Sequence, residues 1–138
     1  MSSLVFELKF SEKGLQAIDI YETESQASYL IDNPFDKLNE KLGHHDVVLD
    51  IQGTSFQKKV WDEICRIPLG KTLSYKALAE KIGKPKAYRA VALACSQNTL
   101  VLIIPCHRVI SSNGKISGYR FGQDLKKKLL AFEKKIKG

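Results

Sequence analysis

Cysteine is scarce in this sequence of 138 residues, and its three copies show no Cys-x-x-C spacing. This pattern argues against a disulfide framework and against a zinc site built on paired cysteines, and it fits a reducing compartment. His44 and His45 have no partner at ligand spacing and are interpreted as turn residues. We therefore expect no bound metal.

Long hydrophobic runs are also missing. The longest apolar run is far too short to span a bilayer, and Glu7, Lys9 and Glu12 interrupt the segment where a signal peptide would have its apolar region. We therefore expect an intracellular protein, cytoplasmic or nuclear according to the organism, with no membrane partner. A content of 43% hydrophobic and 27% charged residues is that of an ordinary globular protein of about one domain.

Acidic residues are few in the C-terminal part. Residues 1–50 carry 4 Lys and Arg against 10 Asp and Glu, whereas residues 51–138 carry 18 against 5. This asymmetry indicates a basic region that binds nucleic acid beside an acidic part that does not contact it. Basic residues on an ordinary solvent-exposed surface explain the asymmetry equally well.

The first 52 residues predict a small α/β unit. Alternating apolar residues on either side of Lys13-Gly14 predict a hairpin, Asn33-Pro34 predicts a helix start, and residues 47–51 predict another strand.

The second region begins with two helix-start signals. Thr54 and Gln57 make a capping box, and Ser74 is suited to cap the next helix before a turn at Gly83. A further helix follows, whose apolar stripe is Ala87, Ala90, Val91, Ala94 and Cys95. The two short helices and the turn between them predict a helix-turn-helix.

One arginine stands out on the far face of that helix. Arg89 falls opposite the apolar stripe, with Ala92 and Ser96 close by, and such small neighbours permit close approach to a nucleic-acid groove. Asn98 falls on the buried side at the helix end, where capping the helix and tying it to the next loop are compatible roles.

The segment Ile-Pro-Cys-His-Arg-Val-Ile places a thiol beside an imidazole. Residues 100–104 form a continuous apolar run, which predicts a buried strand ended by Pro105. A thiol there needs a neighbouring base or cation to become a thiolate, and His107 and Arg108 are the nearest candidates. From spacing alone, Cys106 is equally consistent with a structural core thiol.

The C-terminal segment adds an aromatic loop and a helix. Residues 118–122 form a glycine-flanked loop that could line a pocket, and Asp124 is expected to cap the last helix. Glu133 falls between Leu129 and Leu130 on the helical wheel, which predicts a half-buried carboxylate in need of a partner. A histidine is one candidate partner, and a surface lysine is the alternative.

These motifs, in this order, resemble the O6-alkylguanine-DNA alkyltransferases. The resemblance covers nearly all of residues 53–133 and is carried by Gly53-Thr54-Ser55-Phe56-Gln57, Val60-Trp61, Ile67-Pro68, Gly70-Lys71-Thr72, Ser74-Tyr75, Leu78-Ala79, Ile82-Gly83, Pro85, Arg89-Ala90-Val91, Asn98, Pro105-Cys106-His107-Arg108-Val109-Ile110, Gly118-Tyr119, Lys126, Leu129-Leu130 and Glu133. It implies an α/β (α+β) fold: a small acidic α/β unit in residues 1–52, then a basic, mainly helical, winged helix-turn-helix-like domain in residues 53–138 that carries the active-site cysteine.

The resemblance also implies roles for individual residues. Cys106 would accept the alkyl group, with His107 taking the thiol proton through a water and Glu133 polarising His107. Tyr75 would help to turn the nucleotide outward and would donate a proton to the leaving base. Arg89 would fill the vacated stack, on a helix whose Ala90, Ala92 and Ser96 face the minor groove. Val109, Tyr119, Arg120, Phe121 and Cys95 would form the substrate pocket, and Asn98 would link the helix to the cysteine loop.

The implied function is single-use repair of double-stranded DNA that contains O6-alkylguanine, with O4-alkylthymine as a further substrate, by a monomer without cofactor. Some positions depart from the family pattern: Ala92 replaces a usual glycine, Cys95 a larger apolar residue and Thr99 a proline. Phe121 is bulky where some members have glycine, which predicts a pocket that favours small alkyl groups. The zinc ligands that some members carry are not found in the N-terminal part.

Two alternatives belong to other classes of protein. A non-catalytic alkyltransferase-like lesion-binding protein keeps the DNA-binding helix but lacks the acceptor, and Cys106 argues directly against it. A Cys-His hydrolase usually brings its histidine from far along the chain, whereas here the two residues are adjacent.

Overall fold

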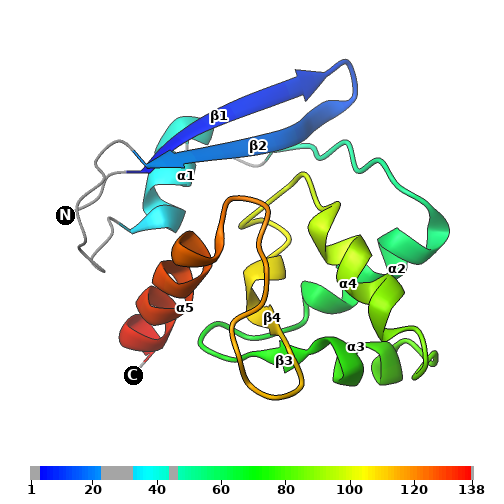
Figure 1. The fold of residues 1–138 in the computed structure, drawn as a ribbon. Coiled ribbons are helices and arrows are strands. Elements are labelled where there is room, and N and C mark those ends of the chain that lie inside the picture. Colours follow the sequence, from blue (N-terminus) through cyan, green and yellow to red (C-terminus); the bar gives the residue numbers. More distant parts are fainter. Residues whose placement is uncertain (1–3, 23–32, 44–46, 138) are drawn as a thin grey trace.

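The structure is a computed structural model that describes residues 4–22, 33–43 and 47–137. His44 and His45 lie outside these residues. The chain opens with the predicted antiparallel hairpin, formed by β1 (Leu4–Ser11) and β2 (Gly14–Glu22), against which α1 (Pro34–Leu42) packs (Figure 1). Gly14 is required at the turn, because a Cβ there would lie 2.3 Å from the Val48 carbonyl oxygen.

The strand predicted over residues 47–51 is reduced to a single parallel bridge between Leu15 and Leu49. The backbone nitrogen of Leu15 donates to the Val48 carbonyl at 2.8 Å, but three residues later Ile18 donates to the Thr99 carbonyl instead. The edge of β2 is thus divided between two segments, which explains why no third strand develops.

The second part of the chain is mainly helical, as predicted. It contains α2 (Ser55–Ile64), α3 (Tyr75–Lys81), α4 (Tyr88–Ser96) and α5 (Gln123–Lys137), with the two-residue strands β3 (Leu73–Ser74) and β4 (Val109–Ile110) paired in parallel. The caps predicted at Thr54 and Ser74 are confirmed by their side-chain hydrogen bonds, and the helix start predicted at Asn33-Pro34 is confirmed, with Asn33 as the N-cap of α1. Helices α3 and α4 contact each other across the turn at Gly83, whose φ is +78°, so the predicted helix-turn-helix is present.

Two local predictions in this part are wrong. Residues 100–104 are buried, apart from the partly buried Ile103, but they form a tight turn in which Leu102 has a φ of 72° and Ile104 donates to the Leu100 carbonyl at 2.8 Å. An apolar run reports burial and does not by itself distinguish a strand from a buried turn. In addition, α5 begins at Gln123, so Asp124 lies in its first turn and does not cap it.

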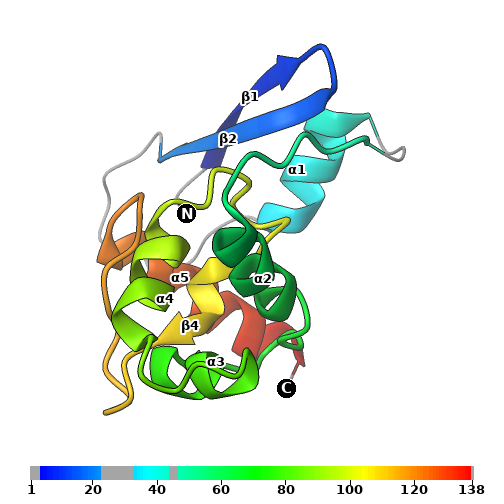
Figure 2. The ribbon, with the colours of Figure 1, turned by 90° about the vertical axis from the view of Figure 1, so that its right-hand side faces the viewer.

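The segment with the 3-10 helix η1 (Cys106–Arg108) and β4 lies between α5 and the group formed by α2, α3 and α4 (Figures 1 and 2). Buried side chains of the hairpin and of the helices form one apolar cluster. Because both parts of the chain contribute to this cluster, it does not mark a division between them, and the domain boundary between residues 52 and 53 stays a prediction. Among the described residues, no helix is long and apolar enough to cross a membrane.

Candidate active site

Asn98 anchors the loop that leads to Cys106. Its side-chain nitrogen donates to the Ile104 carbonyl at 2.8 Å, and its side-chain oxygen accepts from the Leu100 backbone nitrogen at 2.9 Å. The residue is 1% exposed. Gln97, not Asn98, is the C-cap of α4, so Asn98 ties the end of α4 to the turn just before the cysteine.

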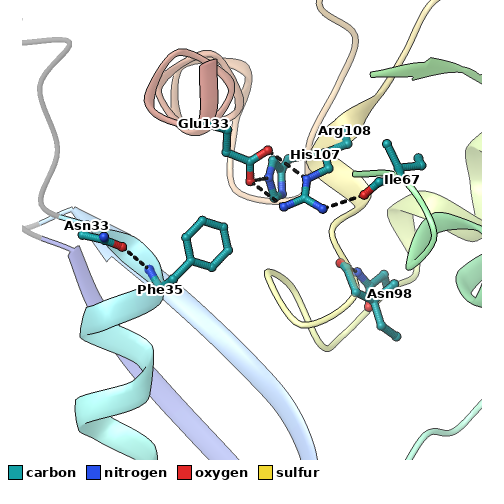
Figure 3. Close-up of polar contacts among 8 residues, drawn as sticks. Asn33, Phe35, Ile67, Asn98, His107, Arg108 and Glu133 are labelled. Atoms are coloured by element: carbon teal, nitrogen blue, oxygen red, sulfur yellow. Dashed lines mark hydrogen bonds and ion pairs between the residues drawn. The ribbon is translucent and has the colours of Figure 1, made fainter. Parts of the chain in front are cut away.

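Three residues form a buried charged cluster behind the cysteine. Glu133 accepts from His107 Nε2 at 2.7 Å, and from Arg108 Nε at 2.8 Å and Nη2 at 3.0 Å (Figure 3). Arg108 Nη1 also donates to the Ile67 carbonyl at 2.8 Å. The histidine partner of Glu133 matches the prediction, but the carboxylate is fully buried, at 1% exposure, and its bidentate pair with Arg108 was not predicted.

The cluster defines the protonation state of His107. Burial raises the pKa of the Glu133 carboxyl, but hydrogen bonds from His107 and Arg108 outweigh this effect and keep the pKa below its usual value. Burial lowers the pKa of His107, so the imidazole is neutral at neutral pH. Because a carboxylate only accepts, Nε2 carries the hydrogen and Nδ1 carries the free lone pair. Nδ1 is buried and has no hydrogen-bond partner among the described residues.

Cys106 is held as a thiol in the resting protein. It is 5% exposed, and burial raises its pKa, while the Asn98 amide and the Lys126 ammonium act in the opposite direction. A buried thiol reacts as a nucleophile only when a base removes its proton. The neutral imidazole of the next residue, with its lone pair on Nδ1, is such a base.

A pocket of about 450 Å³ opens at Cys106. Its lining residues are Tyr75, Ala92, Cys95, Ser96, Cys106, Ser117, Gly118, Tyr119 and Arg120. Two predicted members are not on this lining. Val109 is buried, and its carbonyl accepts from Lys126 Nζ at 2.7 Å; Phe121 packs edge-on against Tyr119, with ring centroids 6.0 Å apart. Phe121 therefore affects the pocket through Tyr119, and the size restriction expected from its bulk is not supported.

Lys126 holds two residues of the pocket lining, Ser117 and Gly118, through hydrogen bonds, a role not assigned from the sequence. It is 1% exposed, and its Nζ donates to the Val109 carbonyl, to Ser117 Oγ at 2.9 Å and to the Gly118 carbonyl at 3.3 Å. Ser117 Oγ in turn lies 2.7 Å from the Tyr75 hydroxyl. On a helical wheel Lys126 shares the face of Leu129 and Glu133, so the wheel that indicated Glu133 could also have indicated Lys126.

The outer face of α4 borders the pocket. Arg89 and Ser96 are exposed, Ala92 is partly exposed, and both Ala92 and Ser96 also line the pocket. Ala90 is exposed and does not belong to the buried stripe, which corrects its assignment to the apolar face. Leu93, 58% exposed and four residues after Arg89, joins this face and was missed by the sequence reasoning.

Comparison with known proteins identifies the family to which this architecture belongs. The family model described as "6-O-methylguanine DNA methyltransferase, DNA binding domain" matches residues 55–135, more than half of the chain and the part that holds the pocket. The chain belongs to the 6-O-methylguanine DNA methyltransferase family. The mixed fold, with a helical helix-turn-helix part, is that of the family's solved structures.

Relatives of the family match over most of the chain. The Methanosarcina barkeri methylated-DNA--protein-cysteine methyltransferase is 43% identical, in a match that covers 89% of this chain and 86% of that protein. The crystal structure of Mycobacterium tuberculosis OGT in complex with DNA superposes with a TM-score of 0.74 at 34% identity, covering 97% of this chain and 92% of that one.

A lesion-binding relative matches over a smaller part. The S. pombe protein Atl1, solved in complex with damaged DNA that contains O6-carboxymethylguanine, gives a TM-score of 0.54 at 34% identity. The match covers 59% of this chain and 78% of that one. The methyltransferase comparison thus accounts for more of the molecule, including the hairpin part.

Proposed function

We propose that this chain repairs double-stranded DNA by moving the alkyl group of O6-alkylguanine onto its own Cys106, once per molecule. The observation that carries this assignment is the arrangement behind the pocket: a buried thiol on the lining, a neutral imidazole on the next residue, and a carboxylate bound to that imidazole at 2.7 Å. The name of the Methanosarcina barkeri relative describes the same reaction type.

Thiolate formation starts the reaction. His107 Nδ1 takes the Cys106 proton through one water, and Glu133 stabilises the imidazolium that results. The thiolate then attacks the alkyl carbon, so that an S–C bond forms while the bond between that carbon and O6 breaks and its electron pair goes to the base. The thioether product is stable, which makes the protein a single-use reagent.

Tyr75 is suited to supply the proton that the leaving base needs. It lines the pocket, and burial raises the pKa of its hydroxyl, so the group is a phenol that can donate. The proton received by His107 balances the one donated by Tyr75, and exchange with solvent restores the phenol.

The outer face of α4 is suited to deliver the flipped base. Ala92 and Ser96 belong both to that face and to the pocket lining, so the pocket opens where the helix would meet DNA. A base turned out of the stack there enters the pocket directly, and the exposed Arg89 is placed to fill the gap in the duplex. The small side chains permit the close approach that a minor groove requires.

A single-turnover assay tests the assignment. The wild-type protein should remove one methyl group per molecule from a duplex that contains O6-methylguanine. Cys106→Ser should bind the same duplex with affinity within a few fold of wild type and remove none. Cys65→Ser is the matched control, because Cys65 is exposed and does not line this pocket, and it should react like wild type. Methyl removal by Cys106→Ser would contradict the assignment, and lesion binding without transfer by the wild type would support the Atl1-like alternative.

A further inference from the structure

Two buried polar atoms around Cys106 lack a hydrogen-bond partner among the described residues: Nδ1 of His107 and the hydroxyl oxygen of Tyr119. No other buried side-chain nitrogen or oxygen in the described part of the chain shares this condition. Leaving either group unpaired in the interior is costly, and native proteins usually satisfy such groups with protein or ordered water. Their occurrence in one site points to a common partner.

Tyr119 lies where it can share that partner. Its ring lines the pocket and meets the His107 ring edge to face, with centroids 6.5 Å apart and an interplanar angle of 82°. Burial raises the pKa of the Tyr119 hydroxyl well above its usual value, and the charges of Cys106 and Glu133 act in the same direction. The hydroxyl therefore stays protonated, on a side chain that lines the same pocket as Cys106 and contacts the His107 ring.

One water satisfies all three groups. It accepts from the Tyr119 hydroxyl and from the Cys106 thiol, and it donates to the lone pair on His107 Nδ1. A buried water with three polar partners is typical of protein interiors. The water takes the thiol proton as it passes one of its own to Nδ1, so it ends neutral, with the negative charge on the Cys106 sulfur and the positive charge on the imidazole. The hydrogen bond from the Tyr119 hydroxyl holds the water oxygen in place between the two groups.

We propose that the Tyr119 hydroxyl holds the water through which His107 deprotonates Cys106. Tyr119 is then a positioning residue for thiolate formation as well as a wall of the pocket, a role that rests on the function proposed above. The titratable and charged groups that surround Cys106 and this path are Tyr75 on α3, Cys95 on α4, Arg108 in η1, Arg120 in the following loop, and Lys126 and Glu133 on α5.

Tyr119→Phe tests the proposal, because it removes the hydroxyl and keeps the ring. We expect methyl transfer from duplex DNA to slow about tenfold at neutral pH, a fraction of what a complete general base contributes, with unchanged duplex affinity. The deficit should shrink as the pH rises and the thiol ionises without the relay. Tyr21→Phe, at an exposed tyrosine of the hairpin, is the control and should match wild type. A deficit that is equal at every pH, or no deficit, overturns the proposal.

Alkylation of Cys106 by iodoacetamide in the absence of DNA separates the relay from the repair function. The rate, followed on the Cys106 peptide, should show the same pH-dependent deficit in Tyr119→Phe. If wild type never takes up methyl from DNA, the function proposed above fails while this rate still tests the relay. If wild type repairs DNA and the two proteins alkylate equally at every pH, only the relay fails.

A spectroscopic measurement on the wild type keeps the test valid if Tyr119→Phe does not fold. The nitrogen-15 chemical shift of His107 Nδ1 should be that of a neutral nitrogen accepting a hydrogen bond. A free lone pair at Nδ1 overturns the proposal. In a folded variant the melting temperature gives a second criterion. The melting temperature of Tyr119→Phe should be lower than that of wild type, because the variant loses the hydrogen bond between the hydroxyl and the water. A higher melting temperature would show that the hydroxyl has no partner in wild type.

Discussion

Glu133 determines the charge of the active site. Its carboxylate is compensated by the Arg108 guanidinium, which is itself 9% exposed, so the resting pair is neutral while His107 stays uncharged. When His107 takes a proton, the carboxylate already lies against its Nε2. In the proposed mechanism the site therefore stabilises the protonated His107 without moving the Glu133 side chain.

Glu133→Gln should destabilise the protein strongly. The substitution leaves the buried Arg108 guanidinium without a counter-charge, and breaking a buried ion pair costs about 3 kcal/mol in the free energy of unfolding. The loss should depend on pH. Because the folded state lowers the Glu133 pKa from about 4.5, the carboxylate contributes stability above that pH and loses it as the pH falls through the lower folded value.

Urea denaturation at stepwise lower pH checks this prediction. The difference between wild type and Glu133→Gln should be largest near neutral pH and should shrink in acid. Glu7→Gln, at an exposed position of β1, should change the free energy of unfolding by no more than about 0.5 kcal/mol. A difference that stays constant down to acid pH would contradict the assigned protonation state.

Cys95 shares the pocket with Cys106 but should not compete for the alkyl group. Burial raises the pKa of Cys95 to about 12, so this member of the pocket lining stays a thiol at neutral pH. Cys95→Ala should therefore still take up one methyl group per molecule. Peptide mass spectrometry after reaction locates the group, and a methylated Cys95 in the wild type would be evidence against a single acceptor.

At the scale of elements, local signals in the sequence predicted where the helices lie, although not the start of α5. The caps at Asn33, Thr54 and Ser74 act on backbone groups within three residues, so sequence spacing determines them. The helical wheel also predicted burial of Glu133, because a regular helix places it on the face of Leu129, but the choice of His107 as its partner came from the family resemblance.

Irregular segments were not predictable in this way. Residues 100–104 turn back on themselves although their composition is that of a strand, and Ser117 meets Tyr75 and Lys126 from a loop that has no periodic pattern. Arg108 adds a bidentate pair that depends on how η1 lies against α5. Tertiary packing decides these contacts, and one sequence does not encode them in its spacing.

Arg89→Ala on α4 should separate DNA handling from alkyl transfer. Arg89 is exposed, so the free energy of unfolding should change by no more than about 0.5 kcal/mol. Without the side chain that we propose fills the stack, repair of duplex DNA should slow by about 10-fold to 100-fold, because base flipping costs a few kcal/mol. Reaction with the free O6-methylguanine base should be unchanged. Equal slowing on the free base would place Arg89 in the chemistry instead.

At the scale of the whole molecule, the charge distribution predicts how the protein finds DNA. The excess of Lys and Arg lies entirely in residues 51–138, which contain α4 and the pocket, whereas residues 1–50 are acidic. The hairpin part is then repelled by the polyanion while the helical part is attracted, which orients the molecule on the duplex.

Duplex affinity should therefore depend steeply on salt. Raising monovalent salt from about 50 to about 200 mM should weaken binding more than tenfold, even for a few phosphate contacts. Methylated and unmethylated duplexes should show the same slope, because the lesion enters a pocket and adds no phosphate contact. Fluorescence anisotropy at several salt concentrations measures the slope, and an affinity that is independent of salt would contradict this orientation.

The most direct test of the central claim is the mass of the Cys106 peptide after the protein has reacted with a duplex that contains O6-methylguanine. We expect this peptide to gain one methylene unit, in an amount equal to the guanine restored, and the Cys65 and Cys95 peptides to gain none. An unmodified Cys106 peptide after the lesion has been removed, or repeated turnover by one molecule, would contradict it.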